Sequence, residues 1–299
     1  MAELPRQNIK NRFPLTLLSK AYLRDHFFEG KAVFPAVEAL ITLARAVQSL
    51  YPEVNLFHLA RAQFPRMLVI DPASDALDVQ IEIETSADGI SASLMTALQI
   101  KNSTIHRTLE HARVTFVRET ASPRPAISWR SLRKLEGECI HVPAVSIYRE
   151  LIPFGLSYQN IIGDLSVSPD GALAEITGGG GEADDSLLGS PFVLDAAMHA
   201  ACVWGQRFTD IVPFPVGIDR RVIYEPTKKG ESYLACIKPV ETSREPLVFD
   251  VWIFAQNGIM CESITGLRMR DVTQGRMRPP RWIQEGIWKK SSSSASEHT

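Results

Sequence analysis

Cysteine is scarce in this sequence and is not arranged for metal or redox chemistry. The 299 residues contain four cysteines, Cys139, Cys202, Cys236 and Cys261. None of them forms a C-x-x-C pair, which excludes zinc ribbons and thioredoxin-like redox motifs. Isolated thiols in a chain of this size are typical of a reducing compartment, so we expect a cytoplasmic protein.

Long apolar runs and an excess of basic residues are also missing. No stretch of about 18 uncharged apolar residues occurs, so we expect no membrane span. The first residues lack the apolar core of a signal peptide. Lys and Arg number 32 against 34 Asp and Glu, a formal net charge of −2. Proteins that bind nucleic acid usually carry a basic excess, and membrane-surface proteins a polybasic patch, so we expect neither class of partner.

The residues that are present indicate a globular chain with two similar halves. Hydrophobic residues make up 45% and charged residues 22%, and the length suits about two domains. In the first half, helical spacing of apolar residues over 34–50 predicts a helix, and 77–84, 89–100 and 111–117 have the patterns of strands. The segment 86–89 is typical of a hairpin turn.

The second half repeats this order of elements. Ser190 is placed to cap a helix over 191–205, which is so apolar that we expect it to be buried. Four strand-like segments follow, at 216–226, 231–240, 247–256 and 259–269. Each half is therefore predicted to wrap a curved antiparallel sheet around a central helix. The predicted boundaries are a first unit at 13–118, a surface linker at 119–138, a second unit at 139–285, and flexible ends at 1–12 and 286–299.

His26, Gly30 and Pro35 stand in the spacing H-x3-G-x4-P just before the first helix. Glycine permits a close approach of the backbone, and proline favours the entrance of a helix. A histidine held there would lie beside backbone N–H groups that can bind an oxyanion. The other histidines show no such setting, and we expect His106 and His111 to lie on the surface.

Asp195 and His199 are four residues apart on the second helix and so share one face of it. Burial among apolar residues disfavours the charged form of a carboxylate, and a protonated carboxyl can donate a proton near neutral pH. The pair could equally be a buried polar contact that stabilises the helix, and the helix alone does not decide between these two interpretations.

Taken together, these motifs resemble the dehydratase domains of polyketide synthases and related fatty-acid systems. The H-x3-G-x4-P motif and the D-x3-H motif, which is written D-x3-Q/H in that family, stand in the family's order. The segments 148–158, ending in Tyr158, and 212–217, containing Pro213 and Phe214, resemble two further family segments. The similarity extends over about residues 14–272. After Tyr158 the family continues Tyr-Gly-Pro, whereas this chain has Gln159 and Asn160, so the shape of its substrate is expected to differ.

The resemblance implies an α+β double hotdog fold that eliminates water from a β-hydroxyacyl thioester. His26 would be the general base, Asp195 the general acid, and His199 the residue that orients the acid. Gly30, Pro35, Tyr158, Pro213 and Phe214 would border the substrate. The family needs no metal and no organic cofactor. Its substrate arrives on the phosphopantetheine arm of an acyl carrier protein, and the other synthase components would act in trans.

The sequence leaves two other functions open. The same acid and base could serve a double-bond isomerase or a cyclase, and the fold could be a non-catalytic scaffold. The presence of both His26 and Asp195 counts against the scaffold. Two tandem units already resemble a dimer, so both a monomer and a homodimer remain open.

Overall fold

The computed structural model describes residues 9–99, 106–118, 123–180, 187–241 and 245–286. The predicted flexible ends therefore lie outside the described residues over 1–8 and 287–299, and so does the start of the predicted linker, 119–122. Among the described helices, none is long and apolar enough to cross a membrane.

The first unit wraps strands around helix α1 (Ala36–Leu50). The predicted apolar face of this helix is buried against β6, β7 and β8. The other elements of this unit are β1 (Lys10–Leu18), the short 3-10 helix η1 (Ala21–Asp25), β2 (Phe27–Phe28), β3 (Lys31–Phe34), β4 (His58–Gln63), β5 (Leu68–Val69), β6 (Ala76–Thr85), β7 (Gly89–Gln99) and β8 (His106–Val117).

The second unit is built in the same way around helix α4 (Pro191–Phe208), which is buried on all sides from Pro191 to Gln206. A short helix, α2 (Trp129–Leu132), precedes the unit, and the other elements are β9 (Ile140–Pro143), α3 (Ala144–Ser146), η2 (Ile147–Leu151), η3 (Leu156–Tyr158), β10 (Ile161–Ser168), β11 (Gly171–Thr177), β12 (Phe214–Ile223), β13 (Ser232–Glu241), β14 (Leu247–Ala255), β15 (Met260–Arg270) and α5 (Arg281–Glu285).

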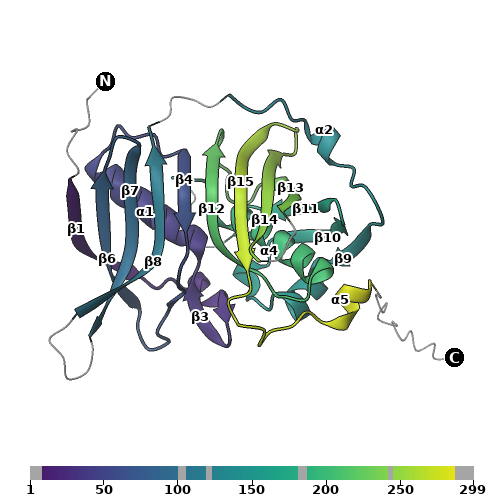
Figure 1. Cartoon of the computed structure of the whole chain (residues 1–299), viewed down its shortest axis with the longest axis horizontal. Coiled ribbons are helices and arrows are strands. Elements are labelled where there is room, and N and C mark those ends of the chain that lie inside the picture. Colours follow the sequence, from purple (N-terminus) through teal and green to yellow (C-terminus); the bar gives the residue numbers. More distant parts are fainter. Residues whose placement is uncertain (1–8, 100–105, 119–122, 181–186, 242–244, 287–299) are drawn as a thin grey trace.

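One antiparallel sheet joins the two units. Among the described residues, its strands run in the order β1-β6-β7-β8-β4-β12-β15-β14-β13-β11-β10-β9. The two units meet where β4 pairs with β12 (Figure 1). From that seam the sheet continues through β8, β7 and β6 in the first half and through β15, β14 and β13 in the second. The helices α1 and α4 also contact each other. This arrangement is the predicted double hotdog.

The structure corrects three details of the sequence prediction. Strand β1 begins at Lys10, because Lys10 pairs with Glu84 of β6, so residues 10–12 belong to the first unit and not to a flexible end. The predicted linker 119–138 contains the helical turn α2. Ser190 precedes α4 but does not cap it, because its hydroxyl donates to the carbonyl oxygen of Gly178 at 2.7 Å.

A buried ion pair lies beside the seam. Arg221 of β12 donates from Nε to Oε2 of Glu262 on β15 at 2.8 Å, and it also donates to the carbonyl oxygen of Leu188 at 3.2 Å. Both charged side chains are almost wholly removed from solvent. Arg221 stands opposite Leu59 of β4, so the pair sits where the two units join. A buried charge that loses its partner retains its desolvation cost.

We therefore expect Glu262→Gln to lower the free energy of unfolding by about 3–5 kcal/mol, because it leaves Arg221 charged and unpaired. Urea unfolding followed by circular dichroism measures the change. The double variant Arg221→Met with Glu262→Leu removes both charges and should recover most of the loss. If Glu262→Gln changed the free energy of unfolding by less than about 1 kcal/mol, which is typical of an exposed ion pair, the stabilising role of the buried pair would be contradicted.

Candidate active site

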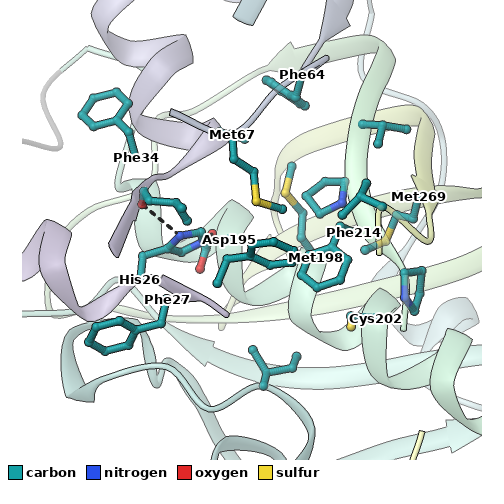
Figure 2. A pocket seen from close by; sticks show the side chains of 18 of the residues that line it. His26, Phe27, Phe34, Phe64, Met67, Asp195, Met198, Cys202, Phe214 and Met269 are labelled. Atoms are coloured by element: carbon teal, nitrogen blue, oxygen red, sulfur yellow. Dashed lines mark hydrogen bonds and ion pairs between the residues drawn. The ribbon is translucent and has the colours of Figure 1, made fainter. Parts of the chain in front are cut away.

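His26 is held by two contacts with one residue of the neighbouring strand. It follows η1, and its carbonyl oxygen accepts a hydrogen bond from the N–H of Val33 at 2.9 Å. Its ring Nδ1 lies 3.2 Å from the carbonyl oxygen of Val33, as the dashed line in Figure 2 shows. A carbonyl can only accept, so Nδ1 carries the proton in the neutral ring. The other nitrogen, Nε2, is then unprotonated and able to act as a base.

Burial keeps the His26 ring neutral. Its side chain retains 17% exposure, and aromatic rings surround it, with Phe154 at 4.3 Å and Tyr158 at 5.2 Å between ring centroids. Desolvation lowers the pKa of His26 from 6.5 to about 4, and it outweighs the opposite effect of the nearby Asp195 carboxylate. The ring is therefore a free base at neutral pH.

Asp195 and His199 meet His26 from the second unit. Both lie on α4 and are 5% exposed. Oδ2 of Asp195 is 2.9 Å from Nε2 of His199, and Oδ1 of Asp195 is 3.9 Å from Nε2 of His26. Neither Asp195 Oδ2 nor His199 Nε2 has an aligned hydrogen-bond partner among the described residues, so the short contact between them is an electrostatic one. The fold thus brings together the three predicted catalytic residues.

A tyrosine that the sequence analysis did not select lies behind His199. The hydroxyl of Tyr148 accepts a hydrogen bond from the N–H of Ile161 at 2.9 Å and lies 3.4 Å from Nδ1 of His199. Because the N–H of Ile161 can only donate, the hydroxyl proton is free to point at Nδ1. The proton of a neutral His199 then sits on Nε2, facing Asp195. The only available signal was the position of Tyr148 at the start of the family-like segment 148–158.

The three residues share the wall of a cavity of about 800 Å³. The cavity is mostly apolar and takes side chains from both units. Of the residues predicted to border the substrate, Gly30, Pro213 and Phe214 line it. The φ angle of Gly30 is +74°, in the left-handed region that glycine adopts without strain, whereas no atom lies within 4 Å of the place a Cβ would take. This position therefore needs glycine for its backbone conformation.

Two residues predicted to border the substrate are not among those that line the cavity. Pro35 is the residue before the first turn of α1. Tyr158 is fully buried behind His26, where its ring packs against Phe192 at 5.3 Å and against Tyr22 at 6.4 Å. Large aromatic rings pack against other rings in the interior, so Tyr158 supports the position of His26 from behind.

His111 does line the cavity, contrary to its predicted surface position. It is 9% exposed, and its Nε2 lies 2.8 Å from the hydroxyl of Thr96. The pairing of β7 with β8 shifts register between Leu94 and Met95, so His111 is an extra residue on β8. Such a bulge redirects side chains toward the interior, and simple alternation along the strand does not reveal it.

Contacts between the units hold the loop that carries His26. The side chain of Asp25 accepts hydrogen bonds from both the N–H and the hydroxyl of Ser157, at 3.0 and 2.7 Å. Its carbonyl oxygen accepts from the N–H of Gly155 at 2.8 Å. A Cβ at Gly155 would lie 2.4 Å from the Asp25 side chain, so the close approach requires glycine there.

Comparison with known proteins finds similarity to polyketide synthase dehydratases and to a fatty acid synthase. Residues 146–279 match the family model described as polyketide synthase dehydratase N-terminal domain. The chain is 24% identical over 228 residues to a polyunsaturated fatty acid synthase polypeptide from Thraustochytrium sp.. That match takes in 74% of this chain but only 8% of the relative, so the chain corresponds to a small part of that much longer protein.

Solved structures share the fold. The dehydratase domain from the CurF module of curacin polyketide synthase has a TM-score of 0.70 at 20% identity, covering 90% of this chain and 96% of that domain. Two inactive mutants of the CurK dehydratase, one with aspartate changed to asparagine and one with histidine changed to phenylalanine, each have a TM-score of 0.65. They are 22% and 21% identical to this chain and cover 90% of it and 94% of their own length.

The family model covers the half of the chain that contains Asp195 and His199, and the shared fold covers both halves. The resemblance to the polyketide synthase dehydratase family that the four sequence motifs indicate is thereby confirmed.

Proposed function

We propose that this protein is a dehydratase that eliminates water from a β-hydroxyacyl thioester. The observation that carries the proposal is that Nε2 of His26 and Oδ1 of Asp195 come from different units and lie 3.9 Å apart on one wall of an apolar cavity. A 1,2-elimination needs a base at one carbon and an acid at the next. The inactive histidine and aspartate mutants of the CurK dehydratase support this pair of roles.

In the proposed reaction, Nε2 of His26 removes the proton from the α-carbon. The electrons of that bond pass to the thioester carbonyl, and backbone N–H groups near Gly30 and the start of α1 stabilise the enolate oxygen. Asp195, in its protonated form, then donates its proton to the β-hydroxyl. The hydroxyl leaves as water and the double bond forms. The residues that act directly are a base, an acid and backbone donors.

Tyr148 and His199 would orient the acid in this mechanism. The contact from Tyr148 places the proton of a neutral His199 on Nε2, 2.9 Å from Oδ2 of Asp195, where its partial positive charge would stabilise the carboxylate after it has given up its proton. We further propose that the substrate is carried on the phosphopantetheine arm of an acyl carrier protein and that the chain works beside other synthase components of polyketide or fatty-acid-like biosynthesis. The fatty acid synthase relative from Thraustochytrium sp. supports this setting.

A dehydration assay tests the proposed acid and base. The protein is incubated with 3-hydroxyacyl thioesters of several chain lengths, and the unsaturated product is detected by its loss of the mass of water. We expect His26→Ala and Asp195→Asn each to reduce the rate by about 10²–10⁴-fold, the usual contribution of a general acid or base. The substitution His141→Ala, at an exposed histidine of β9, is a matched control that should retain full activity.

Unchanged activity in both variants would overturn the mechanism. Wild-type protein that dehydrates none of the thioesters would overturn the dehydratase proposal and favour a cyclase or a scaffold.

The pH profile of kcat/KM gives an independent test of the base. Because the pKa of His26 is lowered to about 4, the ring stays unprotonated well below neutral pH. We expect kcat/KM to show no loss attributable to His26 between pH 7 and 5 and to fall as pH drops through about 4. An ordinary histidine base would instead lose activity near pH 6.5.

Acid unfolding is the control for this profile. An unfolded His26 binds its proton near pH 6.5 and the folded one near 4, so the unfolded chain binds more protons between these values and stability falls as pH falls. Circular dichroism at each pH separates unfolding from titration. A loss of kcat/KM centred near 6.5 in a folded protein, absent from the His26→Ala background, would contradict the lowered pKa.

A further inference from the structure

One face of α4 runs along the cavity beyond the acid. Asp195, Met198, His199 and Cys202 all line it, at the spacing i, i+3, i+4 and i+7 that places residues in a row on a helix. At about 1.5 Å of rise per residue, Cys202 lies about 10 Å along the helix axis from Asp195. The cavity thus continues for nearly two helical turns past the residue that would protonate the β-hydroxyl.

The cavity wall along this face ends at Cys202. One turn further, Gly205 packs against Pro213 so closely that a Cβ would lie 2.5 Å from the proline ring. Gln206 donates hydrogen bonds to the carbonyl oxygen of Leu151 at 3.3 Å and to Sγ of Cys202 at 3.4 Å. Cys202, Leu151 and Pro213 line the cavity, whereas Gln206 does not, so these contacts close the cavity on the α4 side at this end.

The closed end is lined by apolar side chains, of which Met198, Cys202 and Met269 are buried and Phe214 is half-buried. Figure 2 shows Met198, Phe214, Cys202 and Met269 grouped on the side of the cavity away from His26. Cys202 is 7% exposed, and burial raises the pKa of its thiol to about 12, so it is neutral. The lining residues Glu29 and Arg66 of the first unit are exposed to solvent, and so is Arg270, which pairs with Phe214 on the neighbouring strand.

Methionine is concentrated around this cavity. Four of the seven methionines of the chain, Met67, Met198, Met269 and Met277, line it. Methionine is unbranched and flexible, and it adapts to apolar groups of varied shape. A chain of methylene groups is the ligand that such a wall accommodates best, because it presents no polar atom that would lose its hydrogen bonds on burial.

We propose that the acyl tail of the substrate lies along the α4 face toward Cys202, that the substrates are extended apolar acyl chains, and that Cys202 sets the upper limit of their length. This inference rests on the proposed function, because it assumes that the reacting carbons lie at His26 and Asp195. It adds the class of substrate and a specificity-determining residue that does not touch the reacting atoms.

The test compares 3-hydroxybutyryl and 3-hydroxydecanoyl thioesters on the same pantetheine carrier. Wild-type protein should favour the decanoyl chain, because each buried methylene adds about 0.8 kcal/mol of hydrophobic stabilisation. Cys202→Phe fills the closed end and should lower kcat/KM for the decanoyl chain about 10–200-fold, the range for a hydrophobic pocket that no longer fits its substrate. The same variant should keep kcat/KM for the butyryl chain within about 3-fold, because the short chain does not reach Cys202.

Two further variants keep the test decisive. Cys202→Ala removes the thiol without filling the cavity and should keep the decanoyl preference. Cys236→Ala, at a buried cysteine that does not line the cavity, should change neither substrate. Should Cys202→Phe fail to fold, as judged by its thermal unfolding, Cys202→Leu replaces it and should show the same selective loss to a smaller degree.

The outcomes separate this inference from the function on which it rests. Wild-type protein that dehydrates neither thioester would overturn the proposed function. Wild-type protein that dehydrates the butyryl chain but not the decanoyl chain would overturn the inference alone. Equal loss of both substrates in folded Cys202→Phe, or no loss of either, would also overturn it.

Discussion

The pairing of β4 with β12 is the contact on which the rest of the molecule depends. It joins two curved sheets into one and places α1 and α4 against each other inside it. A loop at the start of one unit and a helix in the middle of the other then face a common cavity. The clamp between Asp25 and the backbone of Gly155 and Ser157 holds that loop against the second unit. Neither unit contains both the base and the acid.

Burial gives the polar groups of the cavity their different properties. Asp195 and His199 lie 2.9 Å apart in the same buried site in which removal from water keeps the ring of His26 neutral. Tyr148 determines which ring nitrogen of a neutral His199 carries the proton, because its hydroxyl lies against Nδ1. The apolar lining that causes these effects is also the surface that an acyl chain would contact. The electrostatics of the site and the proposed substrate preference therefore have one physical origin.

Much of this could be predicted from the sequence because the signals are local or periodic. Apolar spacing marked α1, alternation marked β6 and β8, and strand-like runs between turn residues marked β12, β13, β14 and β15. The spacing of His26, Gly30 and Pro35 and the pair Asp195 and His199 marked the candidate site, because the first motif stands before a predicted helix and residues four apart on a helix share one face. Strand β9 was not predicted because it has only four residues, and β10 because a bulge between Ile162 and Ser166 interrupts it. Strands β1 and β11 were not predicted either.

The sequence by itself thus determined two helix-and-sheet units and the chemical groups that each would supply. Only the tertiary structure decided which groups meet. It placed Tyr158 behind His26, away from the cavity, because a large ring gains more from packing among Phe192 and Tyr22 than from a cavity wall. It turned His111 inward through a bulge, and it ended the α4 face at Cys202 through the contact of Gly205 with Pro213. These outcomes depend on contacts between different elements of the fold, which no local pattern records.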